Sequence, residues 1–376
     1  MRIKPGIIAG VLSLVATGIH AEGITATQIL IGQTAGFTGT VAGGVKETTD
    51  GAKLYLDWIN SHGGVNGRKI ILESLDDGFD PKRAGENARK LIEERDVFAM
   101  FLCRGTPHAE AVIPHLKAKG VPLVGPSTGA ELLHTPVNHY VFNVRAKYQL
   151  EAEKAIVQLS TMGINKIGVI YVQDSFGKDA FEGAQKGFKA ANLQPVSVST
   201  YDRTTSKVDG AVQELLKTNP QAGILFGSGS AIADVVHQVR KAGSTMQLVT
   251  ISNNSSGAFV KSLGQNANGV IVTQVFPNPK MTTTRIATEL LKLSRDKPDF
   301  VVSHQAMEGY AAAKVLVEGL KRAGKNPTRE SFIAALEKMR DYDLGGLTVG
   351  YSPTDHTGIE YVELSIIGKR GDFVQR

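Results

Sequence analysis

Residues 97–129 read VFAMFLCRGTPHAEAVIPHLKAKGVPLVGPSTG, which is the pattern of one strand–helix–strand unit. The apolar run at 97–103 predicts a buried strand. Thr106 is a good helix N-cap and a proline follows it, so we expect a helix from there to the next glycine. A second apolar run at 121–124 leads into the turn 125–129. Both turns then lie at the carboxyl ends of neighbouring parallel strands, where ligands bind in open α/β sheets.

The alternation of strands and helices continues on both sides of this unit. One set spans residues 28–145, and a second set starts afresh and ends near 275. Three successive helices follow between 282 and 339, and they are placed most simply over the first set. We expect the strands at 347–350 and 359–367 to join the sheet of the second set. The fold class is therefore α/β, with two doubly wound parallel-sheet lobes joined by a hinge of three segments.

The length of 376 residues exceeds one ordinary core and supports two domains. The chain starts with two basic residues and an apolar stretch, and Ala21 is small enough for cleavage, which indicates a secretory signal. The predicted limits are 1–21 for the signal peptide, 22–146 plus 276–346 for the first lobe, and 147–275 plus 347–376 for the second lobe.

Composition argues against several classes of function. Cys103 is the only cysteine and lies in an apolar run, so we expect a buried side chain and no intramolecular disulfide. The formal charge of +6 falls to +4 once the two basic residues of the signal are removed, and no basic cluster indicates nucleic-acid binding. No stretch after the signal is long enough to span a membrane. The histidines show no metal motif, and the glycines show no phosphate-loop motif, so we expect neither a metal nor a cofactor.

Residues 125–129 also match G-x-S-x-G, the nucleophile motif of α/β-hydrolases. In that alternative the protein is a secreted serine hydrolase that uses Ser127, with Asp355 and His356 following in a permitted order. Pro126 opposes the strained turn that this motif needs, and adjacent residues serve poorly as acid and base. A turn that binds a ligand is the preferred interpretation, and we expect no catalytic residues.

Polar and aromatic residues follow several of the predicted strands. In the first lobe a hydroxyl at Thr106 or the turn at Ser127 could hold a carboxylate, and Arg104 could pair with an anion. In the second lobe an aromatic ring enters a helix and two serines end neighbouring strands. The candidate ligand-binding residues are Thr106, Ser127, Gly129, Phe176, Ser228, Ser252 and Tyr310, with Arg104 and Glu308 as secondary candidates.

The order of several short motifs resembles the type I periplasmic solute-binding proteins of ABC importers, and specifically the leucine/isoleucine/valine-binding group. The likeness runs from about residue 24 to the C-terminus. It rests on the sequences at 51–52 and 60–67, Asp76-Asp77 with Asp80-Pro81, 120–122 followed by 126–128, and 174–177. The resemblance implies two lobes, a three-segment hinge, and a cleft that closes on one small ligand.

The resemblance also implies roles for individual residues. In the amino-acid binders, the positions of Thr106, Ser127 and Gly129 hold the α-carboxylate and amine, although a threonine is usual at Gly129. An aromatic ring at the Phe176 position packs on the ligand side chain. At about Ser228 and Ser252 those proteins have a tyrosine and a glutamate. The missing glutamate matters most, because a buried ammonium needs a charged partner.

Two ligand classes therefore stay open. Either Glu308 or Asp174 replaces the missing carboxylate and the ligand is an amino acid, or the ligand is an organic or aromatic acid without an ammonium. We expect a periplasmic monomer that delivers this ligand to the permease of an ABC importer. A sensory ligand receptor is a further alternative.

Overall fold

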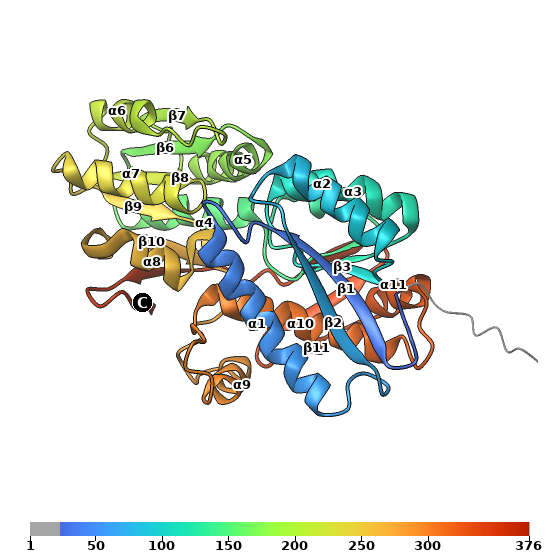
Figure 1. Cartoon of the computed structure of the whole chain (residues 1–376). Coiled ribbons are helices and arrows are strands. Elements are labelled where there is room, and N and C mark those ends of the chain that lie inside the picture. The colour runs from blue at the N-terminus through green and yellow to red at the C-terminus, as the bar shows by residue number, and fades with distance from the viewer. Residues whose placement is uncertain (1–22, 376) are drawn as a thin grey trace, which may run out of the picture.

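The computed structural model describes residues 23–375 and contains two lobes, each built on its own sheet (Figure 1). This confirms the predicted fold class. The predicted signal peptide at 1–21 lies outside the described residues. Within 23–375, the chain passes between the lobes after β5, after β10 and before β14.

The sheet of the first lobe has the strand order β2-β1-β3-β4-β5, and every pair is parallel. Helices α2 and α3, with the short π-helix η1, cover one face, and α1 covers the other face together with helices from the C-terminal part of the chain. The elements are β1 (Gln28–Ala35), α1 (Ala42–Ser61), β2 (Lys69–Asp76), α2 (Pro81–Arg89), η1 (Lys90–Glu94), β3 (Ala99–Phe101), α3 (Thr106–Lys119), β4 (Leu123–Val124), the 3₁₀ turn η2 (Glu131–Leu133) and β5 (Val141–Phe142).

The sheet of the second lobe has the order β15-β14-β10-β9-β8-β6-β7, in which β14 runs antiparallel to both of its neighbours, β10 and β15, and the other pairs are parallel. Its elements are α4 (Tyr148–Thr161), β6 (Ile167–Val172), α5 (Ser175–Ala190), β7 (Ser197–Tyr201), α6 (Asp209–Lys217), β8 (Ala222–Phe226), α7 (Ser230–Lys241), β9 (Gln247–Thr250), the 3₁₀ turn η3 (Ser252–Asn254), α8 (Gly257–Leu263), the 3₁₀ turn η4 (Gly264–Ala267), β10 (Ile271–Gln274), β14 (Glu363–Ile367) and β15 (Phe373–Gln375).

After β10 the chain returns to the first lobe, as the sequence pattern predicts. Helices α9 (Arg285–Ser294), α10 (His304–Arg322) and α11 (Arg329–Glu337) contribute to the core of that lobe, where α10 lies along α1. Such a placement buries their apolar stripes against the free face of the first sheet. It also brings the start of α10 to the carboxyl ends of the strands, where a ligand site is expected.

One strand is placed differently from the sequence expectation. The strand predicted over 347–350 forms β12 (Thr348–Ser352), which pairs with β11 (Tyr342–Asp343) and β13 (Asp355–Gly358) in a separate small sheet. Val349 and Tyr351 belong to the hydrophobic core of the first lobe. We therefore propose that this segment be counted with the first lobe, since its apolar side chains are buried there.

The start of α3 also differs in detail from its prediction. Gly105, with φ of 100°, is the N-cap, and Thr106 is the first helical residue. Thr106 does not cap the helix with its side chain, because its hydroxyl forms a hydrogen bond with the hydroxyl of Thr128 at 2.7 Å. That bond ties the start of α3 to the turn after β4. The two loops that the sequence identifies as ligand-binding therefore lie side by side, and Arg104 and Ser127 also form a parallel bridge.

Candidate functional site

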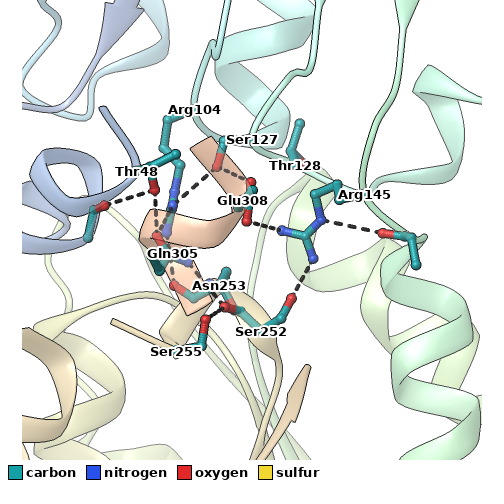
Figure 2. Close-up of polar contacts among 12 residues, drawn as sticks. Thr48, Arg104, Ser127, Thr128, Arg145, Ser252, Asn253, Ser255, Gln305 and Glu308 are labelled. Carbon is teal, nitrogen blue, oxygen red and sulfur yellow. Dashed lines mark hydrogen bonds and ion pairs between the residues drawn. The ribbon is translucent and has the colours of Figure 1, made fainter. Parts of the chain in front are cut away.

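The carboxyl ends of the two sheets face each other, and a buried polar cluster fills the space between them (Figure 2). Arg104 and Ser127 enter from the first sheet, Ser252 and Asn253 from the second, and Glu308 from α10. The structure thus brings together four of the predicted site residues, Arg104, Ser127, Ser252 and Glu308, from both lobes. Side chains that converge from both lobes at strand ends form the arrangement expected of a ligand site.

Arg104 connects the two lobes directly. Its Nη1 donates to Gln305 Oε1 at 2.6 Å and to Ser127 Oγ at 3.3 Å, while its Nη2 donates to the Asn253 carbonyl oxygen at 2.9 Å. Gln305 Nε2 in turn donates to the Ser252 carbonyl oxygen at 3.1 Å. Burial lowers the pKa of the Arg104 guanidinium below its ordinary value. These bonds from first-lobe side chains to second-lobe backbone hold the cleft closed.

Arg145 occupies the centre of the cluster and is only 1 % exposed. Its Nη2 donates to Glu151 Oε1 at 2.6 Å and to Ser252 Oγ at 2.5 Å. Its guanidinium also stacks over the Tyr148 ring, 4.5 Å from the centroid. Burial would lower the pKa of Arg145, but Tyr148, Glu308 and Glu151 outweigh burial and raise it. Arg145 therefore carries a fixed positive charge.

Glu151 holds Arg145 in place from the second lobe. It is fully buried, and burial raises the pKa of its carboxyl above the ordinary value in spite of its partners. One oxygen accepts from Arg145 and from the Ser252 hydroxyl, and the other accepts from the Ser252 backbone N–H and the Thr273 hydroxyl. Every oxygen of this carboxylate is thus engaged within the protein.

Ser127 lacks the partners of a hydrolase nucleophile. Its Oγ donates to Glu308 Oε1 at 2.6 Å and accepts from Arg104, and no histidine of residues 23–375 forms a hydrogen bond with it. His356 stacks on Phe142, and its Nδ1 forms a hydrogen bond with the Val141 carbonyl oxygen at 2.9 Å. The geometry does not favour the hydrolase alternative, because the proposed base does not contact the proposed nucleophile.

The other predicted residues lie around the cluster in different ways. Phe176 packs edge to face on Tyr148, with ring centroids 4.9 Å apart, so it reaches Arg145 through that ring. Ser228 accepts from Asn253 Nδ2 at 2.9 Å. Tyr310 lies outside the polar cluster, and its ring packs on Tyr55 in the core of the first lobe.

Gly129 departs from the expectation that the resemblance carries for this position. A Cβ atom there would lie 2.4 Å from the Ala146 carbonyl oxygen and 3.0 Å from the Tyr148 backbone nitrogen. A threonine does not fit this backbone, because the close neighbours are backbone atoms that cannot rotate away. Gly129 contributes its carbonyl oxygen, which accepts from the Tyr148 N–H at 2.8 Å.

Two cavities flank the cluster between the lobes. One, of about 160 Å³, lies between the loop 39–44, Arg104 and α8. The other, of about 360 Å³, is lined by Phe79, Tyr201, Arg203 and Ser228 among others. Both lie beside the cluster, whose own residues are buried, so a ligand reaches the cluster itself only when the lobes separate.

Several residues of the cluster were not indicated by the sequence patterns. Arg145, Glu151, Tyr148, Gln305 and Asn253 all contact the predicted residues. A usable signal did exist for Arg145, which follows the short apolar run of β5 just before the second lobe begins. Recognising that run as a parallel strand would have placed Arg145 at the same sheet edge.

Two further classes of feature were sought among residues 23–375. No group of histidine, cysteine, aspartate and glutamate side chains there could hold a metal ion. No helix of that part of the chain is long and apolar enough to cross a membrane.

Comparison with known proteins places the chain among binding proteins. A family model described as periplasmic binding protein matches residues 28–371. The Leu/Ile/Val-binding protein homolog 3 of Brucella melitensis is 27 % identical over 333 residues, covering 87 % of this chain and 88 % of that protein. A solved substrate-binding periplasmic protein from Ralstonia solanacearum has a TM-score of 0.87 and 34 % identity, covering 93 % of this chain and 100 % of its own. A possible leucine/isoleucine/valine-binding protein from Rhodopirellula baltica also reaches a TM-score of 0.87, with 27 % identity, covering 93 % of this chain and 96 % of its own.

Proposed function

Since the chain belongs to the periplasmic binding protein family, as a type I member of the leucine/isoleucine/valine-binding group, we propose that it is the solute receptor of an ABC importer. It captures an amino acid or a small carboxylate in the cleft between the lobes and delivers it to the membrane permease. It acts as a periplasmic monomer, reaches the periplasm by means of a signal at 1–21, and performs no chemistry on the ligand.

The observation that carries this proposal is the buried polar cluster between the two lobes. Arg104, Arg145 and Glu308 are buried where the two lobes meet, and both arginines donate hydrogen bonds to atoms of the second lobe. A ligand that pairs with these groups from both lobes favours the closed arrangement over the open one. Binding and closure are thereby coupled, which is what a receptor needs if a permease is to distinguish its loaded form.

Opening must break the bonds that Arg104 and Gln305 make to the second lobe. In the open form water forms hydrogen bonds with the same donors and acceptors. Each bond between the lobes therefore stabilises the closed form by only about 1 kcal/mol, and by somewhat more where the charged Arg104 is the donor. The lobes can therefore separate without loss of either core, because each lobe keeps its own hydrophobic cluster. The ligand supplies the remaining free energy of closure.

We expect a ligand screen by thermal shift to identify a bound solute. Purified residues 22–376 would be heated with amino acids, short peptides, amides, and aliphatic and aromatic carboxylates. A ligand at 100 times its Kd adds about 2.7 kcal/mol to the native state, enough to raise the Tm by several degrees. The expected hits are amino acids or carboxylates, since guanidinium groups line the cleft.

Two arginine variants give this screen its control. Arg104→Leu is expected to lose most of the ligand-induced shift, because it removes a buried positive charge of the cleft together with its bond to the Asn253 carbonyl oxygen in the second lobe. Arg89→Leu changes an exposed arginine of α2 in the same way and should keep the full shift. If no compound shifts the wild-type protein, and mass spectrometry finds no small molecule released on denaturation, the proposed function is wrong.

A further inference from the structure

The cluster has one donor and one acceptor that the protein leaves unused. Arg145 Nη1 is buried without a hydrogen-bond partner among residues 23–375. Glu308 Oε2 lies 3.7 Å from this nitrogen, beyond hydrogen-bond distance. Glu308 accepts the Ser127 hydroxyl through Oε1, and Oε2 accepts no hydrogen bond from the described residues. A cation and an anion thus lie side by side, each with free bonding capacity.

Glu151 cannot supply this capacity, although it lies against Ser252, where the resemblance implies a glutamate for the ligand ammonium. Both of its oxygens are engaged by Arg145, Ser252 and Thr273. Asp174 is also engaged: it caps α5 through the Gly177 N–H and pairs with Arg203. Of the carboxylates considered from the sequence, only Glu308 faces the cluster with an oxygen to spare.

The charge of the cluster also restricts the ligand. Arg104 and Arg145 face Glu151 and Glu308, so the four buried groups sum to a formal charge of zero. A bare carboxylate would bury one unbalanced negative charge, and a bare amine would bury one unbalanced positive charge, at a cost of several kcal/mol. A zwitterion adds no net charge and brings one partner for each unused atom.

We propose that Arg145 and Glu308 are the specificity-determining pair of this receptor and that its ligand is a zwitterionic amino acid. The carboxylate accepts from Arg145 Nη1, and the ammonium donates to Glu308 Oε2. In an α-amino acid the carboxylate and the ammonium are about 3 Å apart. Arg145 Nη1 and Glu308 Oε2 are 3.7 Å apart, so the ligand can form both charged hydrogen bonds at the same time. The inference rests on the proposed function and narrows its ligand class.

The pair also explains how the receptor manages without a glutamate at position 252. The anionic partner of the ammonium has moved from the second lobe to helix α10, which the first lobe carries. The cationic partner of the carboxylate is an arginine at the crossing between the lobes, fixed by Glu151. Ligand charges would therefore bridge the first lobe and the hinge.

Matched ligand pairs test this inference by isothermal titration calorimetry. Each pair joins an amino acid to the acid that lacks only the amine: L-leucine and 4-methylpentanoate, L-valine and 3-methylbutanoate, L-phenylalanine and 3-phenylpropanoate, L-alanine and propanoate, and L-glutamate and glutarate. We expect at least one amino acid to bind, and its des-amino partner to bind about 10-fold or more weakly, because Glu308 would lose its ammonium. Glu308→Gln should weaken amino-acid binding by about 10- to 100-fold and remove most of that preference.

Glu318→Gln is the matched control, since Glu318 lies on the same helix and pairs with Arg322 at the surface. Unchanged amino-acid affinity in Glu308→Gln would overturn the inference. A des-amino acid that binds the wild-type protein as tightly as its matched amino acid would also overturn the inference. In that case the proposed function would still hold, because a small carboxylate would be the ligand. If neither member of any pair binds and the wider screen is also negative, the proposed function fails as well.

Discussion

Replacing Arg145 with methionine is expected to lower the free energy of unfolding by about 3–5 kcal/mol. The side chain is 1 % exposed, and its main partner, Glu151, is fully buried. The variant leaves the Glu151 carboxylate in a low-dielectric site with hydroxyl and N–H partners but no counter-charge. The midpoint of urea unfolding, followed by circular dichroism, would measure the loss.

The pH dependence of this loss separates a charge effect from a packing effect. Without Arg145 the folded pKa of Glu151 rises further above its unfolded value, so the stability from this group is present at acid pH and lost as pH rises. The deficit of Arg145→Met should therefore be larger at pH 7 than at pH 5. Adding Glu151→Gln should restore part of the stability at pH 7, because it neutralises the orphaned charge. A deficit independent of pH, or a double variant no more stable than the single one, would contradict this account.

Local signals made several elements predictable from sequence. An aspartate followed by a proline at 80–81 predicts the start of a helix, and α2 begins at Pro81 with the Asp80 side chain accepting the N–H groups of Lys82 and Arg83. The sequence over 69–76 predicts a strand, and β2 has these bounds; α3 ends at the predicted glycine. The starts and ends of such elements are specified by residues that are neighbours in the chain, so they can be predicted from the sequence alone.

The misplaced strand depended on contacts that the sequence does not display. The pattern at 347–350 predicts a strand but does not indicate with which other strands it pairs. Its pairing with β11 and β13 follows from the way α11 places it over the core of the first lobe. The two-residue strand β5 is too short to give a periodic pattern, so its short apolar run is the one sequence signal that marks it.

The same limit explains which site residues were found. Arg104, Ser127 and Ser252 were predicted because each follows a strand in a parallel sheet. Arg145 and Glu151 were not, because a charged side chain is normally assigned to the surface, and its burial shows only when both members of a pair meet. Tyr310 was chosen for its position near the start of α10, but that side of the helix faces the core.

Gly309→Ala is expected to destabilise the protein by about 3 kcal/mol, the upper end for overpacking, and to weaken ligand binding as well. Helices α1 and α10 pack against each other at two glycines. A Cβ atom at Gly309 would lie 1.7 Å from the Thr48 carbonyl oxygen, and one at Gly51 would lie 1.9 Å from the Ala306 carbonyl oxygen. Both neighbours are backbone atoms, so one methyl group forces the helices apart.

Gly210→Ala provides the control, since Gly210 lies in α6 with open space around its Cβ position. There the better helix propensity of alanine should raise stability by up to about 1 kcal/mol. Opposite signs for one substitution would show that the α1–α10 contact, not glycine itself, sets the result. Because α10 carries Gln305 and Glu308, and α1 carries Thr48, displacing the helices should also lower ligand affinity in Gly309→Ala and leave it unchanged in Gly210→Ala. Equal unfolding midpoints for Gly309→Ala and wild type would refute the close packing on which the position of Glu308 depends.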